Sequence, residues 1–462
     1  MRDVELQELD SPLFKGGIHG PRCALESVGR VAYTRPMSPT DTPAPTAVRQ
    51  GVLGFTLVVT AIAYLDRVCI SMAAPAMKAE LGISDVQMGW VFSAFTLAYA
   101  LFEVPSGWLA DRFGARLMLT RIVVWWSALT AATAAAAGFS SLLFIRFLFG
   151  VGEAGAFPSM ARAYARWLPA RERGRAFGLT LMAGALGGAL TQPLVVALLG
   201  WMNWRHTFVL FGAVGLVWAA AWFWWFRDDP HAHPAVNAAE LRLIGSDPPL
   251  PHAGVPWSAL LRDRNLIALC LMYLFAIYGW YFYLTWLPTY LLRARGFDLK
   301  QVGWLAALPL LSIAVGVLVG GWASDVLSRR WGPRAGRRAP GLVGLPLAAV
   351  AIVAGVLTPT AASSALCFAA AAGLAALGVS PAWAVCLEIG GRHAGVVSGA
   401  MNTFGNLGGA LSPLVIGFGL ERWGGWTPSL LSIAVSYVLA ALCWLRIDPT
   451  RAIRAVGETP PA

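Results

Sequence analysis

The chain of 462 residues is 57% hydrophobic and only 13% charged, roughly half the charged fraction of a typical soluble protein. A net charge of +11 is also typical of nucleic-acid-binding proteins, but most of the arginines lie in short loops between long apolar runs. The composition therefore excludes a soluble globular protein and predicts a polytopic membrane protein that contacts the lipid bilayer and no nucleic acid.

The six cysteines are scattered without the spacing of a metal site or a disulfide framework. The sequence also lacks the HExxH, GxSxG and P-loop motifs that mark common enzyme sites. We therefore expect no metal, no cofactor and no enzymatic activity.

The apolar segments are long enough for membrane helices. Residues 1–47 are polar and rich in proline, serine and threonine, which predicts a disordered tail. At about 1.5 Å per residue, each later apolar segment can cross a hydrocarbon core of about 30 Å. The predicted fold class is an all-α membrane protein with twelve transmembrane helices. These spans cover residues 50–74, 86–109, 116–137, 140–161, 175–199, 205–226, 266–292, 301–325, 340–358, 362–387, 395–419 and 427–446.

Arginine and lysine predict the orientation. They are concentrated in the loops that follow the even-numbered spans, which places both termini in the cytoplasm. A polar middle loop, 227–265, is then cytoplasmic and separates an N-terminal six-helix bundle (48–226) from a C-terminal one (266–447). A cytoplasmic tail, 448–462, ends the chain. We expect the protein in the bacterial inner membrane, which is the plasma membrane.

The two halves are related in sequence. The run GWLAD at 107–111 recurs as GWASD at 321–325, an offset of 214 residues. Duplicated halves with a site at their interface are typical of secondary transporters. Two further echoes keep nearly the same offset, 171–178 with 392–399 and 188–193 with 409–413.

A signature rich in glycine and arginine ends the second span. The run GWLADRFGAR resembles the loop 2–3 signature of the major facilitator superfamily, G-x-x-x-D-R-x-G-x-R. A basic loop that only sets topology would explain the arginines but not the acid or the glycine spacing. In that superfamily the loop works as a gate latch. The resemblance implies this role for Gly107, Asp111, Arg112, Gly114 and Arg116.

Four further segments narrow the resemblance to the anion:cation symporter family, which includes permeases for sugar acids, tartrate and phthalate. The resemblance implies two pseudo-symmetric six-helix bundles that work by alternating access, with a small organic anion as cargo. The segments are YLDR at 64–67, GEAGAFP at 152–158, GWYFYLTWLPTY at 279–290 and SGAMN at 398–402.

Four ionisable residues fall inside the first and fourth spans. Asp66 and Arg67 reach a depth comparable to that of Arg146, and Glu153 follows Arg146 by two turns on the same face. Asp66 can then face Arg146 while Arg67 faces Glu153. A charge at the centre of a membrane helix costs at least ~2.5 kcal/mol, which favours a functional site over a static network that only locks helix packing.

The resemblance implies that Arg67 binds the substrate carboxylate and that Asp66 and Glu153 couple the proton. An arginine fork suits a carboxylate because it is planar and always charged. An anion that takes Arg67 removes the partner of Glu153, whose carboxylate then favours protonation. We therefore expect proton-driven import of a small organic anion by a monomeric carrier.

Other candidates have a structural alternative. Tyr281 and Trp286 either turn inward or belong to an interfacial aromatic belt. Asn402 binds substrate hydroxyls or joins helices by hydrogen bonds. Glu103 lies near the inner surface or adds a titratable group. The remaining substrate-binding candidates are Tyr64, Tyr99, Arg146, Ser380 and Trp383.

Two other functions remain open. A neutral-solute carrier or drug exporter would share the fold, although the four buried charges disfavour it. A membrane sensor that transports nothing is the second alternative. The sequence does not name the anion.

Overall fold

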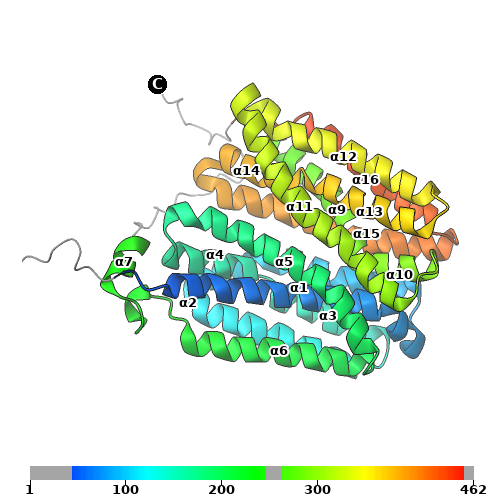
Figure 1. Cartoon of the computed structure of the whole chain (residues 1–462), viewed down its shortest axis with the longest axis horizontal. Coiled ribbons are helices and arrows are strands. Elements are labelled where there is room, and N and C mark those ends of the chain that lie inside the picture. The colour runs from blue at the N-terminus through cyan, green and yellow to red at the C-terminus, as the bar shows by residue number, and fades with distance from the viewer. Residues whose placement is uncertain (1–43, 246–259, 261, 452–462) are drawn as a thin grey trace, which may run out of the picture. The chain divides into compact units, whose positions relative to one another are not determined.

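The computed structural model describes residues 44–245, 260 and 262–451, and these ranges contain helices but no strands. The predicted tails 1–47 and 448–462 lie mostly outside the described residues. The helices before the middle loop are α1 (Val48–Leu81), α2 (Asp85–Ala132), α3 (Phe139–Glu153), α4 (Ala156–Trp167), α5 (Ala170–Leu199) and α6 (Trp204–Trp225), as Figure 1 shows.

The helices after the middle loop supply the six spans of the second half. The first of these spans is divided between α9 and α10, and the fourth between α13 and α14. The helices are α9 (Arg264–Thr285), α10 (Leu287–Arg293), α11 (Leu299–Trp331), α12 (Pro333–Leu357), α13 (Ala361–Ala376), α14 (Val379–Gly390), α15 (Ala394–Arg422) and α16 (Thr427–Trp444).

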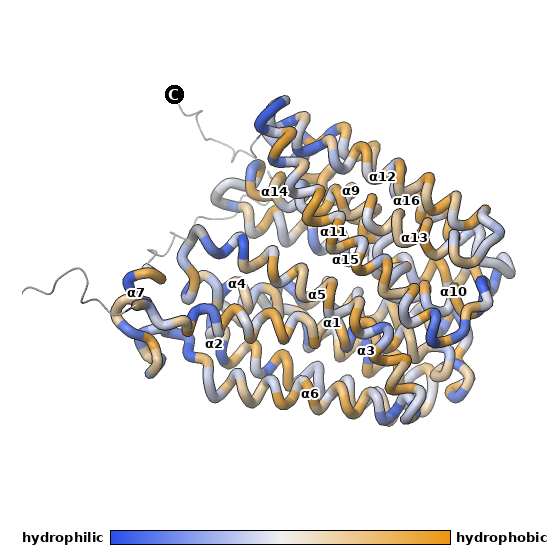
Figure 2. Tube along the Cα trace, viewed as in Figure 1, coloured by the Kyte–Doolittle hydropathy of each residue, from blue (hydrophilic) through white to orange (hydrophobic). Residues whose placement is uncertain are grey.

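Eleven helices of the described ranges, some of them counted with the helix that follows, are long and apolar enough to cross a membrane. Figure 2 shows hydrophobic colour along the helices and hydrophilic colour mainly at their ends. The twelfth expected span, 86–109, is helical as the first part of α2, but it contains Glu103 and is not among the eleven. Large apolar side chains such as Trp224 (74% exposed) and Leu190 (67%) face outward, as lipid contact requires. The all-α membrane fold is confirmed.

The two halves pack against each other through equivalent helices. The most extensive contacts between them join α2 to α15 and α5 to α11. In the order of spans these are the second with the eleventh and the fifth with the eighth. The second and eighth spans hold equivalent positions in the two halves, and so do the fifth and eleventh. The two contacts are therefore related by the pseudo-symmetry expected of two six-helix bundles.

Three spans contain a break. The predicted span 140–161 divides at Gly155, which has φ 92°, the predicted span 266–292 divides between α9 and α10, and the predicted span 362–387 divides between α13 and α14. A Cβ atom at Gly155 would come within 2.4 Å of the Cβ atom of Ser106 on α2, so only glycine fits. The first break leaves Glu153 as the last residue of α3. Non-helical backbone at membrane depth is tolerated where it is buried in protein or lines a cavity.

Two glycines show that the halves share backbone geometry. Gly114, at the corner inside α2, has φ 83° and ψ 161°, and Gly332, between α11 and α12, has φ 86° and ψ 159°. Each follows one of the echoed GWxxD runs. A positive φ favours glycine, which explains why each half has a glycine at this corner.

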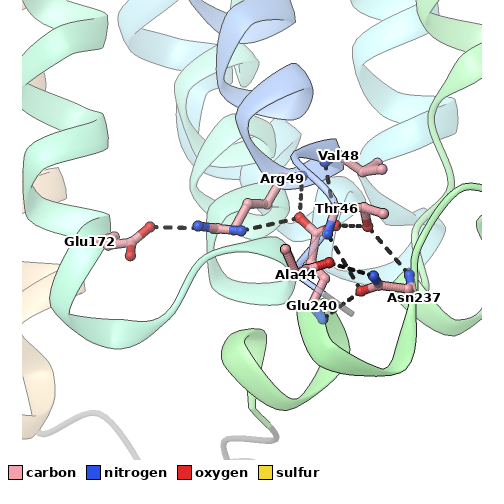
Figure 3. Close-up of polar contacts among 7 residues, drawn as sticks. All are labelled: Ala44, Thr46, Val48, Arg49, Glu172, Asn237 and Glu240. Carbon is pink, nitrogen blue, oxygen red and sulfur yellow. Dashed lines mark hydrogen bonds and ion pairs between the residues drawn. The ribbon is translucent and has the colours of Figure 1, made fainter. Parts of the chain in front are cut away.

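The middle loop is attached to the first half through α7 (Ala238–Ile244). The α1 helix lacks a side-chain cap of its own, since Ala47 precedes it. The buried carboxylate of Glu240 takes this place, accepting hydrogen bonds from the backbone N–H of Val48 (3.4 Å) and of Arg49 (3.0 Å). Figure 3 shows Arg49 between Glu240 and Glu172. The Arg49 side chain pairs with Glu240 at 3.3 Å and with Glu172 at 3.7 Å. A carboxylate suits the positive end of a helix dipole.

Replacing Glu240 with alanine is expected to lower the free energy of unfolding by about 1–3 kcal/mol, because buried donors lose their acceptor. The measurement is thermal unfolding of the purified protein in detergent. Glu421→Ala is the matched control, since Glu421 accepts the Val86 N–H at the start of α2 from an exposed position. Ser84 already caps that helix, so the control should lose less. Equal losses would contradict the assigned role of Glu240.

Candidate transport site

Arg67 and Glu153 form a buried ion pair between α1 and the end of α3. The Nε and Nη2 atoms of Arg67 each lie 2.6 Å from Oε1 of Glu153. The Glu153 side chain is 1% exposed and that of Arg67 is 12% exposed. The other carboxylate oxygen, Oε2, is buried and has no hydrogen-bond partner among the described residues. The structure thus brings together Arg67 and Glu153, the pair of opposite charges expected from the sequence.

Three aromatic rings surround the Arg67 guanidinium. Its central carbon lies 4.9 Å from the ring centre of Tyr99, 5.1 Å from that of Phe95 and 5.4 Å from that of Tyr64. We call Tyr64, Phe95 and Tyr99 the aromatic cage. Ring faces attract a guanidinium and keep water from it, so the cage holds Arg67 without neutralising it. Phe95 was missed by sequence reasoning, since an apolar residue in a membrane span carries no distinguishing signal.

The expected contact between Asp66 and Arg146 is not formed. Both side chains are buried, yet neither carboxylate oxygen of Asp66 accepts a hydrogen bond from a described residue. The Arg146 guanidinium instead packs over Phe149 (4.5 Å) and over Phe95 of the aromatic cage (5.3 Å). The electrostatic neighbours of Asp66 still include Arg146 and Glu153. Asp66 is therefore a buried acid near the pair but outside it.

The second half contributes polar side chains to the same region. Tyr281, on α9, is 8% exposed and interacts electrostatically with Arg67. Trp383 donates its indole N–H to the Tyr273 hydroxyl at 3.2 Å. Tyr273 also belongs to the electrostatic surroundings of Tyr64. Tyr273 was not singled out from the sequence, where it is one tyrosine among several in the seventh span.

Asn402 is bonded across the two halves. Its side-chain nitrogen donates to both carboxylate oxygens of Glu103, at 2.7 and 2.9 Å. Asn402 lies on α15 and Glu103 on α2, so the bond joins helices of different bundles. Glu103 is half-buried. This contact does not decide between a position near the inner surface and an additional titratable group, so both stay predictions.

Two predicted substrate-binding residues are engaged in packing. Trp286 is fully buried and donates its indole N–H to the Pro413 carbonyl at 3.2 Å. Ser380 donates its hydroxyl to the Val317 carbonyl at 2.8 Å within the second half. Neither makes a contact with Arg67 that the described structure records.

Within the predicted gate latch, Arg116 attaches α2 to the end of α6 in the first half. Arg116 donates from Nε and Nη2 to the Phe223 carbonyl near the end of α6, at 2.9 and 2.7 Å. Its backbone N–H donates to Asp228 at 3.1 Å. The Arg112 guanidinium packs near its neighbours Trp108 and Phe113. The contacts of the side chain at position 111 and the surroundings of position 107 lie outside what the structure describes.

The halves are joined at the end where α2 begins. Asp85 pairs with Arg293 at 3.1 Å, and the Val86 N–H donates to Glu421 at 2.7 Å. Gly89 lies so close to the Pro413 carbonyl of α15 that a Cβ atom would sit 2.7 Å from its oxygen. These contacts close the space between the bundles on one side of the Arg67–Glu153 pair.

An apolar cavity of about 700 Å³ lies apart from the charged residues, between α2, α3, α9 and α15. Trp90, Phe144, Phe147 and Leu411 are among the residues that line it. It contains neither Arg67 nor Glu153, and its walls suit lipid chains better than an anion.

Known proteins resemble the chain over most of its length. A Major Facilitator Superfamily domain matches residues 56–413. The chain is 37% identical over 418 residues to a probable sulfoacetate transporter, SauU, of Cupriavidus necator, covering 89% of this chain and 96% of the relative. It is 32% identical to a probable galactarate/D-glucarate transporter, GudP, of Bacillus subtilis (87% and 92% covered), and 30% identical to a D-galactonate transporter of Escherichia coli (88% and 97%).

Solved structures show the same fold. A bacterial homologue of the human lysosomal transporter Spinster, in an inward-facing and unoccupied conformation, superposes with a TM-score of 0.72 at 20% identity, covering 87% of this chain and 97% of that one. The comparisons indicate a transporter and not an enzyme. The chain therefore belongs to the major facilitator superfamily, among its transporters of sugar acids and other organic anions.

Proposed function

We propose that this protein is a proton-coupled symporter that carries a small organic anion into the cytoplasm by alternating access. The observation that carries the proposal is the buried Arg67–Glu153 pair inside the aromatic cage. The relatives named above are described as transporters of sulfoacetate, galactarate or glucarate, and galactonate, all of which are organic anions.

The buried pair links anion binding to proton binding. Removing one partner of a buried ion pair costs about 3–5 kcal/mol, because the other charge is left without compensation. A substrate carboxylate or sulfonate supplies a new partner for Arg67. Glu153, no longer paired, is then neutralised by a proton, so the two ligands bind together more readily than either binds alone.

Asp66 is proposed as a second proton site. Its carboxylate is fully buried without a hydrogen-bond partner among the described residues. Burial penalises an ionised carboxylate that has no hydrogen-bond donor, and Arg146 packs over Phe149 and Phe95 without donating a bond to it. Asp66 can thus hold a proton while Glu153 is paired with Arg67.

The direction of transport follows from the orientation proposed for the membrane. With both termini in the cytoplasm, the contacts of Asp85, Arg293 and Glu421 lie at the extracellular end. The structure is then a form closed to the outside, from which a bound anion is released inward. We place the carrier in the bacterial inner membrane and propose that a monomer suffices, since one chain supplies both halves of the site.

The test uses purified protein in proteoliposomes. Thermal stability is first measured against galactonate, galactarate, sulfoacetate and neutral galactose, because a ligand at 100 times its dissociation constant stabilises by about 2.7 kcal/mol. Counterflow of the labelled anion that stabilises most is then followed, with and without an inward proton gradient. We expect counterflow without a gradient, and accumulation only when the gradient is imposed.

Each alternative gives a different result. A sensor would bind an anion but exchange no label. A neutral-solute carrier or drug exporter would exchange galactose or an apolar cation and ignore the anions. If accumulation of the anion is unchanged when a protonophore collapses the proton gradient, proton coupling is overturned while anion transport stands.

A further inference from the structure

Glu103 is an acid that takes no part in the coupling mechanism proposed above. It lies on α2, and both its carboxylate oxygens accept hydrogen bonds from Asn402 on α15. Glu103 follows Asp85, the first residue of α2, by 18 positions, which is about 27 Å along a helix. Arg67 precedes Leu81, the last residue of α1, by 14 positions, or about 21 Å. Glu103 thus lies roughly one helical turn beyond Arg67, measured from the closed end.

The charges around Glu103 relate it to the anion site. Tyr99, a residue of the aromatic cage over Arg67, precedes Glu103 by four positions on α2, so the two lie one turn apart on the same face of the helix. Besides the neighbouring Asp66, two acids are then related to Arg67. Glu153 contacts it directly, and Glu103 stands further along the path with its oxygens occupied by Asn402.

Glu103 is bound to the Asn402 amide. An anion with its first charged group at Arg67 and its other end directed toward α15 meets this amide–carboxylate pair. A hydroxyl at the far end of the substrate can join the pair, because it can donate to a Glu103 oxygen and accept from Asn402. A second carboxylate or sulfonate at the same place can only accept. It would compete with Glu103 for Asn402 and be repelled by the like charge.

We propose that Glu103 is a specificity-determining residue that selects anions with one charged end and a neutral hydroxyl-bearing end over anions charged at both ends. The inference rests on the proposed function, since it presumes that Arg67 binds the first charged group. Glu103 acts as a fixed anion within the path of the substrate, and its bond to Asn402 keeps it pointed at the second half.

The experiment compares two matched ligand pairs by binding and by counterflow in proteoliposomes. Galactonate and galactarate share a six-carbon skeleton and differ in one end, a hydroxymethyl group or a carboxylate. Isethionate and sulfoacetate differ in the same way on a two-carbon skeleton. In the wild type we expect the monoanion to bind at least ten-fold more tightly than the dianion, within whichever of the two pairs binds. In Glu103→Gln, whose amide oxygen can still accept from Asn402, we expect the dianion to gain about ten-fold while the monoanion changes by less than about three-fold.

The matched control is Glu421→Gln. Glu421 is another acid that joins the two halves, by accepting the Val86 N–H, but it lies at the closed end. Its replacement removes the same charge and should leave the ratio of monoanion to dianion unchanged. A comparable change of ratio in Glu421→Gln would mean that net charge, and not the position of Glu103, sets the preference.

The other outcomes are equally decisive. A wild type that prefers the dianion, or a Glu103→Gln variant with an unchanged ratio, overturns the selectivity assigned to Glu103 while the transport function stands. If none of the four anions binds the wild type or exchanges, the proposed function fails first. Asn402→Ala gives an independent check, because loss of the amide should weaken both members of the pair that binds, without reversing their order.

Discussion

In a Glu153→Gln variant, proton-driven accumulation of the anion should disappear while exchange across the membrane continues. Glutamine keeps the shape of the side chain, and its amide oxygen can still accept from Arg67, whose Nε and Nη2 atoms both approach Oε1. What it removes is the group that gains a proton when the anion takes Arg67. A gradient of one pH unit supplies about 1.36 kcal/mol per coupled proton, a ten-fold concentration ratio, and this ratio should fall to one.

The measurement is the internal concentration of labelled anion with an inward proton gradient, beside counterflow without one. Asp66→Asn is the matched variant, because Asp66 is equally buried but has no contact with Arg67 that the structure records. If Asp66 is the main proton site instead, Asp66→Asn abolishes accumulation and Glu153→Gln retains it. A Glu153→Gln carrier that still concentrates its substrate would show the coupling role of Glu153 to be wrong.

Arg67→Lys should weaken anion binding by at least about 100-fold although the positive charge remains. The guanidinium is planar, so it can stack against the aromatic cage and present two nitrogens to one carboxylate. An ammonium group is a compact, strongly hydrated charge that cannot do both. The loss should be seen as a higher dissociation constant and as counterflow that saturates only at much higher anion concentration.

A second arginine separates this effect from a general loss of stability. Arg295 packs near the Tyr290 ring at 5.6 Å and donates to the carbonyls of Gly355 and Thr358, far along the chain from the proposed site. Arg295→Lys should lower the melting temperature and leave the anion affinity within about three-fold. Equal affinity losses in the two variants would remove Arg67 from the binding site.

The pairing of Arg67 with Glu153 was within reach of the sequence because few charged residues fall inside the spans, and such residues need partners of opposite charge. Helix rise placed Arg67 level with Arg146, two turns from Glu153, so depth alone did not select the partner. Rotation of each helix about its own axis is set by tertiary packing, and depth does not determine it. For this reason the expected Asp66–Arg146 contact was wrong, and the Phe95 ring lies beside both arginines instead.

The breaks in the spans were equally inaccessible. Glycine is common in membrane helices, and nothing in the sequence distinguishes Gly155, which adopts a positive φ, from glycines that remain helical. The close approach of Ser106, a residue of another helix, is what makes Gly155 special. The bond between Glu103 and Asn402 also depends on how two bundles meet, and their positions are almost 300 residues apart.

The cap that Glu240 provides for α1 has a consequence for biosynthesis. Arg49 and Glu240 are separated by 191 residues, so the start of the first helix is completed only after the whole first half has been translated. At typical rates of about 5–20 residues per second, this delay lasts roughly 10–40 s. The first half therefore becomes complete just before the second half is synthesised, and in a nascent chain stopped after α6 the start of α1 would lack this cap.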